Sequence, residues 1–467
     1  MNRQELIEEL SKIVGTEDVF SSRRDVLVYE YDSTPEAFEP EVVLFPANAA
    51  EASAVMKLAA REGRVVVPRG AGTNVSGGTL PVKGGIVLGC SRMTGPPRID
   101  TANERAVVEP GIINLELQNT LAPLGYLYAP DPASQKVSTL GGNVGENSGG
   151  PHCLKYGVTT NHVYGLEVVL ADGQVIHTGG KVEDNPGYDL TGLMVASEGT
   201  LGAVTSMTLR LMRSPESIKT MLAIFDTLED SSNAVSDIIA EGIIPATLEI
   251  MDKTITWAVE TSYHSGFPLD AEGILIIELD GLRDGQERQA EQIVEICRRN
   301  HVREVKVAQS DAERNNLWAG RRGAFGAVAR VAPMYSVQDG AVPRTRLSET
   351  MVRVVQIADK WGVKVGTVAH AGDGNLHPLI MYNPKDREEV ERVHKAGKEI
   401  LKLCLEVGGT LTGEHGIGVE KQDSMALQFG PDELATFALV KKTFDPNGML
   451  NPNKLLPNQQ AAAGMGV

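Results

Sequence analysis

The sequence has few cysteines, a deficit of basic residues and no long apolar run. Its four cysteines, Cys90, Cys153, Cys297 and Cys404, lie far apart, so the chain has neither the spacing of an iron–sulfur ligand set nor a disulfide framework. Lys and Arg number 44 against 61 Asp and Glu, a formal net charge of −17, which disfavours nucleic acid and anionic membranes as general partners. Since no transmembrane segment is evident, we expect a cytoplasmic protein that reaches a membrane only through a partner.

The length and the order of the predicted elements bound the architecture. A chain of 467 residues is expected to form two or three domains. The apolar residues of 6–14 form one stripe of an N-terminal helix, and Pro215 marks a boundary after an alternating strand. From Ile218 onward, strands and helices alternate without a low-complexity linker, which indicates a separate α+β domain.

A glycine-rich segment at 68–79, PRGAGTNVSGGT, lies between two strand-like apolar runs. Gly70, Gly72, Gly77 and Gly78 allow the backbone to turn its N–H groups toward one point, an arrangement that suits a pyrophosphate. A P-loop requires a lysine where Gly78 stands, and a βαβ dinucleotide fingerprint requires a third glycine and a following helix. Neither motif fits, and a plain glycine-rich turn remains the alternative.

A second glycine cluster follows at 139–150, TLGGNVGENSGG. Its side chains at Thr139, Asn143, Asn147 and Ser148 can hydrogen-bond a phosphate or a ligand rich in carbonyl groups. One such segment is explained by a turn, whereas two of them suggest a shared ligand.

Two histidines near an Asp373-Gly374 turn form a candidate metal site. Asp-Gly between apolar runs is a strong signal for a two-residue β-hairpin turn. A turn of that kind places His370 directly opposite His377, with Cβ atoms about 4.5–5.5 Å apart. Both imidazoles could then hold one metal ion. The alternative is that these are core or turn histidines.

A third ligand is suggested by Glu414 and His415, which lie side by side between glycines. Neighbouring side chains of an extended chain point in opposite directions, so Glu414 can bind a metal while His415 faces a substrate. Two histidines and one carboxylate leave open coordination positions, as in catalytic sites, and suit zinc, manganese, iron or cobalt.

Several motifs in the same order resemble a known family. They are PRGAGTNVSGGT, DPASQKVSTLGGNVGENSGGPHCLKYG and GYDLTGLMVASEGTLGAVT. Together they resemble the FAD-linked oxidases with a vanillyl-alcohol-oxidase type fold, in the branch of glycolate oxidase and the D-lactate dehydrogenases. The resemblance covers Pro40 to Pro457. It implies an α+β fold with a two-subdomain FAD-binding domain at 1–215, an α+β cap domain for substrate and metal at 216–420, and a C-terminal segment, 421–467, that returns to the FAD domain.

The resemblance also implies which residues contact FAD. They are Pro68, Arg69, Gly70, Gly72, Thr73, Asn74, Ser76 and Gly77 around the pyrophosphate; Pro132, Ser134, Thr139, Gly142, Asn143, Asn147 and Gly149 along the adenine, ribose and flavin ring; Glu198, Gly199 and Val204 at the adenine end; and Asn451 by the ring. Members that attach the flavin covalently use a histidine or cysteine. Because the first glycine segment has Asn74 and Ser76 instead, we expect FAD to be bound without a covalent link.

In the family, the positions of His370, His377 and Glu414 bind a divalent metal, and that of His415 supplies the base. The implied reaction begins with a 2-hydroxy acid on the metal, after which His415 removes the hydroxyl proton while hydride leaves for the flavin N5. Arg321 matches the family arginine that pairs with the substrate carboxylate. Arg322 points elsewhere, because adjacent residues of a helix do not share a face.

One departure from the family bears on the substrate. Relatives that oxidise 2-hydroxy dicarboxylates have a lysine just before the aspartate that matches Asp339, and this chain has none in Tyr335–Asp339. An unpaired second carboxylate would cost several kcal/mol to bury. We therefore expect a small monocarboxylate, lactate or glycolate, with the D form preferred for lactate. A D-2-hydroxyglutarate-type dehydrogenase is the alternative.

The electrons must leave through a partner, because the chain has no cluster cysteines of its own. An electron-transfer flavoprotein, an iron–sulfur subunit and a quinone are all compatible acceptors. Two further hypotheses stay open. One is a non-haem metal oxygenase or hydrolase built on His370, His377 and Glu414, and the other is a non-catalytic redox or assembly subunit.

Overall fold

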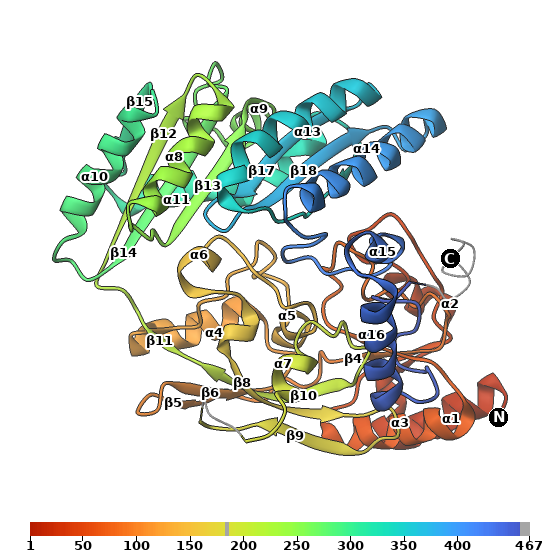
Figure 1. The fold of residues 1–467 in the computed structure, drawn as a ribbon. Coiled ribbons are helices and arrows are strands. Elements are labelled where there is room, and N and C mark those ends of the chain that lie inside the picture. Colours follow the sequence, from red (N-terminus) through yellow and green to blue (C-terminus); the bar gives the residue numbers. More distant parts are fainter. Residues whose placement is uncertain (183–185, 458–467) are drawn as a thin grey trace. The chain divides into compact units, whose positions relative to one another are not determined.

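The computed structural model describes residues 1–182 and 186–457, so the end of the predicted C-terminal segment lies outside the described residues. The chain forms two compact units (Figure 1). The first comprises Met1–Gly149, Val158–Arg213 and Glu414–Val467, and the second comprises Gly150–Gly157 and Ser214–Gly413. Among the described helices, none combines the length and the apolar character needed to cross a membrane.

The first unit begins with a four-stranded sheet in the order β1-β2-β4-β3. Its strands are β1 (Val19–Phe20), β2 (Val42–Leu44), β3 (Val66–Arg69) and β4 (Ile86–Gly89), of which β2, β4 and β3 run parallel. The parallel crossover from β2 to β3 is the helix α3 (Ala49–Glu62), which Asn48 caps and Gly63 ends in the left-handed conformation. Helix α1 (Arg3–Val14) packs Leu6, Leu10 and Val14 into the same core, as their spacing predicts.

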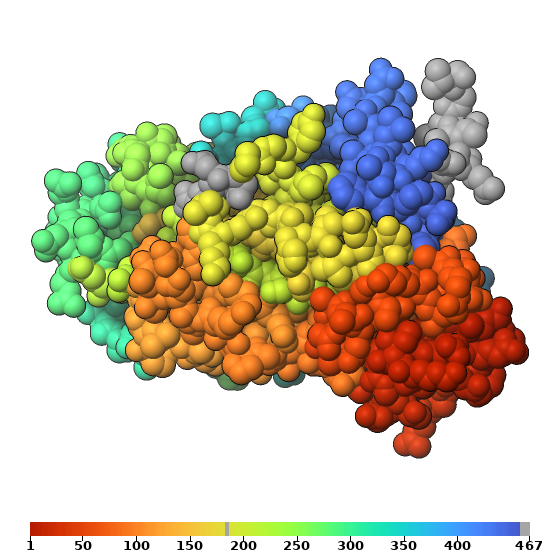
Figure 2. Space-filling model, turned by 90° about the horizontal axis from the view of Figure 1, so that it is seen from below, coloured from red at the N-terminus to blue at the C-terminus, as the bar shows by residue number. Residues whose placement is uncertain are grey.

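A second sheet of the first unit is antiparallel and has the order β5-β6-β10-β8-β9. Its strands are β5 (Arg98–Asp100), β6 (Arg105–Val108), β8 (Val163–Val169), β9 (Val175–Gly179) and β10 (Ala203–Arg210). Its core contains buried residues of three helices, α4 (Asn114–Leu121), α5 (Leu140–Glu146) and α7 (Leu190–Met194). Seen from below in Figure 2, the red and orange atoms of the N-terminal segment lie against yellow atoms of later segments of the same unit.

The C-terminal segment completes the first unit. After α15 (Met425–Gln428) and α16 (Pro431–Phe444), the chain returns to the edge of β3, where Val66 N–H donates to Met449 and Asn451 N–H donates to Val66. The ammonium of Lys441 donates to the carbonyls of Thr200 and Leu450 at 2.6 and 2.7 Å and so fixes this return.

The second unit is built on a seven-stranded antiparallel sheet with the order β15-β12-β14-β13-β17-β18-β16. Its strands are β12 (Ser217–Phe225), β13 (Thr247–Asp252), β14 (Gly273–Gly281), β15 (Glu304–Val307), β16 (Met334–Val337), β17 (Lys364–His370) and β18 (Asn375–Tyr382). Its main core contains residues of α8 (Leu228–Ala240), α10 (Gln286–Arg299), α13 (Leu347–Trp361) and α14 (Arg387–Glu406). The remaining helices include α6 (Cys153–Tyr156), α9 (Lys253–Tyr263), α11 (Asp311–Arg322) and α12 (Ala324–Ala327).

The predicted α+β fold class is confirmed, with one local surprise. The second glycine cluster is not a plain loop, because its first half forms α5 despite three glycines. Thr139 caps this helix by accepting a hydrogen bond from Gly142 N–H at 3.2 Å, and Asn147 ends it in the left-handed conformation. A good cap at each end and burial of Leu140 and Val144 offset the low helix propensity of glycine.

Candidate functional site

The first glycine segment forms a loop between β3 and β4 that is organised by one side chain, Asn74. Its Oδ1 atom accepts hydrogen bonds from Ser76 N–H at 2.9 Å and Gly78 N–H at 2.7 Å. Gly72 and Gly77 have φ values of 73° and 83°, which only glycine adopts readily. Asn74 therefore shapes the loop, a role that the sequence alone did not distinguish from contact with a ligand.

Arg69 supports this loop through its guanidinium group. The buried guanidinium donates to Tyr31 O at 2.7 Å and Thr79 Oγ1 at 3.4 Å, and a Cβ atom at Gly72 would lie only 2.2 Å from its Nη2 atom. Burial lowers the pKa of Arg69, an effect that the charge of Asp32 opposes.

The two glycine clusters meet where β3 ends and α5 begins. A Cβ atom at Gly70 would lie 2.4 Å from Thr139 Oγ1 and 3.4 Å from the Gly142 Cα atom. Only glycine at position 70 permits this approach. The structure thus brings together two segments that are far apart in the sequence, as expected if they serve one ligand.

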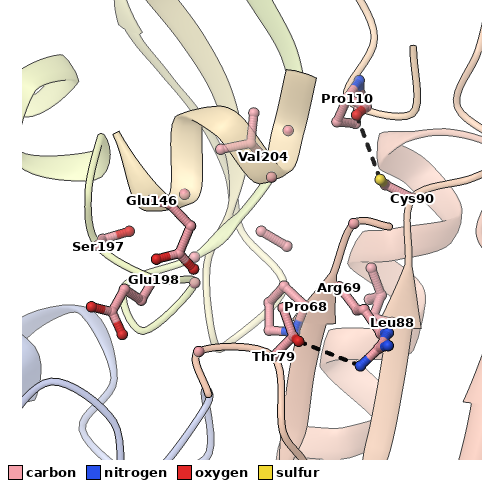
Figure 3. Close-up of a pocket in the computed structure, with 18 of the residues that line it drawn as sticks. Pro68, Arg69, Thr79, Leu88, Cys90, Pro110, Glu146, Ser197, Glu198 and Val204 are labelled. Atoms are coloured by element: carbon pink, nitrogen blue, oxygen red, sulfur yellow. Dashed lines mark hydrogen bonds between the residues drawn. The ribbon is translucent and has the colours of Figure 1, made fainter. Parts of the chain in front are cut away.

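A cavity lies beside this junction within the first unit (Figure 3). Seven of the predicted FAD contacts line it: Pro68, Arg69, Gly70, Gly142, Glu198, Gly199 and Val204. The others do not: Gly72, Thr73, Asn74, Ser76, Gly77, Pro132, Ser134, Thr139, Asn143, Asn147, Gly149 and Asn451.

Some of these outlying residues have evident structural roles. Asn147 accepts a hydrogen bond from Thr160 N–H at 2.8 Å through its side chain, and the Ser134 carbonyl accepts from Val137 and Ser138 N–H at 2.8 Å. Asn451 Nδ2 donates to the carbonyls of Gly78 at 2.8 Å and Glu198 at 2.6 Å.

Glu198 lines the cavity but also holds another segment in place. Its carboxylate accepts hydrogen bonds from Ile417 N–H at 2.8 Å and Gly418 N–H at 2.9 Å, in the loop that follows His415. The His415 carbonyl accepts from Ser76 Oγ at 2.9 Å. The first unit therefore ties the Glu414-His415 segment to both the glycine loop and Glu198.

The cavity also has residues that the sequence reasoning missed. Cys90 lies in its lining, and burial raises the pKa of this thiol to about 11. Glu146, the last residue of α5, lines it as well. Burial, followed by the charges of Glu198 and Asp32, holds the pKa of Glu146 well above its usual range. No sequence signal distinguished Glu146 from the polar surface of a loop.

In the second unit, the two histidines lie together, but not in the predicted register. The pairing is His370 with Asn375 and Val368 with His377, so the prediction that His370 and His377 are directly opposite is wrong. The reason is the turn, which has four residues rather than two and is closed by Gly374 N–H donating to His370 O at 3.1 Å. The histidines are diagonal neighbours on one face, with ring centroids 5.1 Å apart.

A buried carboxylate lies behind His370. The Nδ1 atom of His370 is 2.8 Å from Oε1 of Glu249 on β13. Glu249 also forms an ion pair with Arg321 on α11. All three side chains are buried. Burial raises the pKa of Glu249, but the charges of Arg321 and His370 outweigh it and leave this pKa below its usual value. A donor bond from Nδ1 to a carboxylate directs the other ring nitrogen, Nε2, toward a ligand.

Asp339 is placed similarly toward the second histidine. Its Oδ1 atom lies 3.7 Å from Nδ1 of His377, and its Oδ2 atom accepts from the hydroxyl of Thr412 and from Gly413 N–H at 3.1 Å. Glu414 is the next residue along the chain. It belongs to the first unit, so its coordination beside the two histidines stays a prediction.

The donor set of the second unit suits a divalent cation. It has two buried imidazoles on one sheet face. Glu249 lies within hydrogen-bond distance of Nδ1 of His370, which is the usual support of a histidine metal ligand, and Asp339 lies 3.7 Å from Nδ1 of His377. Arg321 lies in the same group, where Glu249 already balances its charge. Its role as partner of a substrate carboxylate stays a prediction.

Comparison with known proteins agrees with the fold. Residues 40–179 match the FAD binding domain family, and residues 214–455 match the family of FAD linked oxidases, C-terminal domain. The chain is 40% identical over its whole length to glycolate oxidase subunit GlcD of Escherichia coli, of which it covers 94%. It is 32% identical over 96% of its length to D-lactate dehydrogenase of Archaeoglobus fulgidus, of which it covers 99%.

Solved structures share the fold at low sequence identity. p-Cresol methylhydroxylase matches with a TM-score of 0.82 at 16% identity, over 98% of this chain and 97% of that one. 4-Ethylphenol oxidase from Gulosibacter chungangensis matches with a TM-score of 0.78 at 19% identity, over 98% of both chains. These likenesses confirm the vanillyl-alcohol-oxidase type fold. The family matches and the curated relatives together show an FAD-dependent enzyme, and the chain belongs to the FAD-linked oxidases.

Proposed function

We propose that this enzyme is a metal-dependent dehydrogenase that oxidises a small D-2-hydroxy monocarboxylate, lactate or glycolate, and passes the electrons to a partner. The observation that carries the proposal is the pair His370 and His377, with Glu249 and Asp339 on their Nδ1 sides. Relatives named for glycolate and D-lactate oxidation support the substrate class.

The FAD is proposed to occupy the cavity of the first unit without a covalent link. Cys90 is the thiol of this cavity, and a pKa raised to about 11 keeps it protonated and poorly nucleophilic. Acid precipitation of the holoenzyme should release all of its flavin into the supernatant. Flavin retained in the pellet would contradict non-covalent binding.

The proposal assigns a role to each predicted metal-binding and catalytic residue in the second half of the chain. His370, His377 and Glu414 hold the divalent cation, Arg321 orients the substrate carboxylate, and His415 accepts the hydroxyl proton. The bound metal would make that hydroxyl more acidic, and the flavin would take up the hydride.

The preference for a monocarboxylate is supported by residue 338. Gln338 is buried and its amide nitrogen is 3.2 Å from Ser336 Oγ, so this position offers no charge to a second carboxylate. We expect kcat/KM to be higher for D-lactate or glycolate than for D-2-hydroxyglutarate. The opposite order would assign the enzyme to the dicarboxylate class.

Anaerobic reduction of the flavin tests the whole assignment. D-Lactate or glycolate should bleach the flavin, chelation should abolish bleaching, and one of zinc, manganese, iron or cobalt should restore it. His415→Ala should slow bleaching by about 10²–10⁴-fold, the usual contribution of a general base, and still retain metal. His370→Ala and His377→Ala should lose metal, measured by elemental analysis.

His394→Ala is the matched control, because this histidine is exposed on α14 and should keep full metal content. Equal metal content in His370→Ala, His377→Ala and the control would contradict the metal site. It would also remove the basis of the alternative metal oxygenase or hydrolase. A flavin that no hydroxy acid reduces would instead favour a non-catalytic redox subunit.

The electron acceptor is proposed to be a second protein, either an iron–sulfur subunit or an electron-transfer flavoprotein, in a cytoplasmic complex. One relative is named as a subunit of glycolate oxidase, and none of the four cysteines forms a cluster motif. Purification from the host under mild conditions should recover a redox protein with this chain. Rapid turnover of the isolated chain with oxygen alone would contradict a dedicated partner.

A further inference from the structure

The cavity of the first unit contains a carboxyl group that the proposed mechanism does not use. Glu146 reaches from the end of α5 into the cavity, near Glu198 (Figure 3). Its Oε2 atom is shielded from solvent and has no hydrogen-bond partner among residues 1–182 and 186–457. A buried polar atom in this state costs free energy unless a ligand completes its bonding.

Two glycines make room for this carboxyl group. A Cβ atom at Gly78 would lie 2.7 Å from Oε1 of Glu146, and a Cβ atom at Gly416 would lie 2.6 Å from its Oε2. The same Gly416 position is 2.8 Å from Oε1 of Glu198. Glu146 is thus held between the first glycine loop and the loop that follows His415.

Burial and the charges of Glu198 and Asp32 favour the neutral form of Glu146. A hydrogen bond from Asn74 and the charge of Lys421 oppose them but do not outweigh them. Lys454 belongs to the same cluster, and burial lowers its pKa to about 8 while its ammonium donates to Leu80 O at 2.7 Å. Burial raises the pKa of Glu198 as well, but two backbone hydrogen bonds, from Gly418 and Ile417, oppose this rise, so Glu198 is the member of the pair that is better stabilised as an anion.

We propose that Glu146 is a positioning residue for FAD, which in its neutral form donates its carboxyl hydrogen to an acceptor atom of the bound dinucleotide. This inference rests on the proposed placement of FAD in the cavity. The pyrophosphate offers acceptors alone, and the flavin ring offers more acceptors than donors. A neutral carboxyl can satisfy them, whereas an ionised one would present only acceptors and would repel the phosphates.

Two substitutions separate the donor from its charge. In FAD titrations of the apoprotein at pH 7, Glu146→Gln should bind FAD within about threefold of the wild type, because the amide keeps a donor of similar shape. Glu146→Ala should bind about tenfold more weakly, the usual effect of one lost hydrogen bond. Equal FAD affinities of the two variants would overturn the proposal, whether both bind FAD as well as the wild type or both bind it more weakly.

The pH profile of binding tests the protonation state. Wild-type FAD affinity should fall as pH rises through the ionisation of Glu146, and Glu146→Gln should lack this decline. Burial lowers the pKa of Lys454 to about 8, so this group can titrate in the same experiment, and the two proteins are compared in a Lys454→Arg background, where the local positive charge persists. Identical profiles with and without Glu146→Gln in that background would overturn the proposal.

A spectroscopic readout applies even if Glu146→Ala fails to fold. The reduced-minus-oxidised infrared difference spectrum of the wild-type holoenzyme should contain the C=O stretch of a protonated carboxyl, and Glu146→Gln should lack it. Absence of this band from the wild type would overturn the proposal. Gly70→Ala tests separately whether FAD occupies this cavity. If Gly70→Ala leaves FAD affinity unchanged, FAD binds elsewhere. If Gly70→Ala weakens FAD binding but Glu146→Ala does not, only the role of Glu146 is rejected.

Discussion

Glu146 in the first unit and Glu249 in the second are both carboxyl groups removed from water, yet their pKa values move in opposite directions. Burial raises both. For Glu146, the neighbouring carboxylates Glu198 and Asp32 add to this effect. For Glu249, the charges of Arg321 and His370 reverse it. The comparison teaches that burial alone does not decide the charge of a carboxyl group, because the sign of its nearest partner does.

The two states suit two different tasks. A neutral acid can donate a hydrogen bond to a dinucleotide that carries negative charge. A fixed carboxylate behind an imidazole holds the ring in one tautomer and strengthens it as a metal ligand. Each unit thus supplies the form of the same side chain that its proposed ligand requires.

The largest expected effect comes from removing Glu249. Glu249→Ala leaves the buried charge of Arg321 without its anion, and we expect the free energy of unfolding to fall by about 3–5 kcal/mol. Metal affinity should fall by about 10–100-fold, because His370 loses its orienting partner. Urea unfolding and metal titration measure the two effects. Glu249→Gln, which keeps the shape, should give a smaller loss of stability; wild-type stability and metal affinity in both variants would break the comparison.

Gly70→Ala tests how Glu146 is positioned, because the added methyl group would clash with Thr139, the N-terminal capping residue of α5. The new Cβ atom would lie 2.4 Å from Thr139 Oγ1, and overpacking of this kind costs about 1–3 kcal/mol. Thr139→Ala removes the clashing oxygen but also a helix cap worth about 1 kcal/mol. The double variant should therefore lose less stability than the two single losses added together. Strict additivity would show that the two segments are not coupled.

A smaller effect is expected in the pH dependence of apoprotein stability. The folded-state pKa of Glu146 is raised above the unfolded value of about 4.5. Its contribution to the free energy of unfolding is therefore fully present below that pH and is lost as pH rises toward the folded pKa. Glu146→Gln lacks this loss. Its stability relative to the wild type should increase with pH, by up to about 1.4 kcal/mol per unit across this interval. A constant difference from pH 5 upward would show that Glu146 ionises normally.

The sequence correctly predicted that His370 and His377 lie close together, but not their exact pairing. Asp373-Gly374 correctly indicated a hairpin, but the number of turn residues depends on backbone conformation that these letters do not specify. His370 and His377 still share a face, because a register shift of two residues preserves the alternation of side chains in a strand. Glu249 was within reach of the sequence, since a glutamate between the apolar residues Leu248 and Ile250 of a predicted strand requires a partner if it is buried.

Other features could not be predicted from the sequence. Glu146 follows a run of glycines that indicates a loop, but the caps at Thr139 and Asn147, together with burial of Leu140 and Val144, stabilise this run as a helix. Segment 150–157 packs with the second unit, although no change of composition marks its ends. Both depend on contacts with residues far away in the chain, which local patterns do not encode.

The smallest expected effect is at Lys253 and Glu272, an ion pair whose side chains are 51% and 48% exposed. Water screens this pair, so Glu272→Ala should change the free energy of unfolding by about 0–1 kcal/mol, and 1 M salt should abolish the difference. The loss in Glu249→Ala should persist in the same salt, because ions do not reach Arg321 in the core. Unfolding of both variants at low and high salt measures this. If salt reduced the stability losses of Glu272→Ala and Glu249→Ala equally, the partner that keeps Glu249 ionised would not be shielded from water. The contrast with Glu146 would then lose its physical basis.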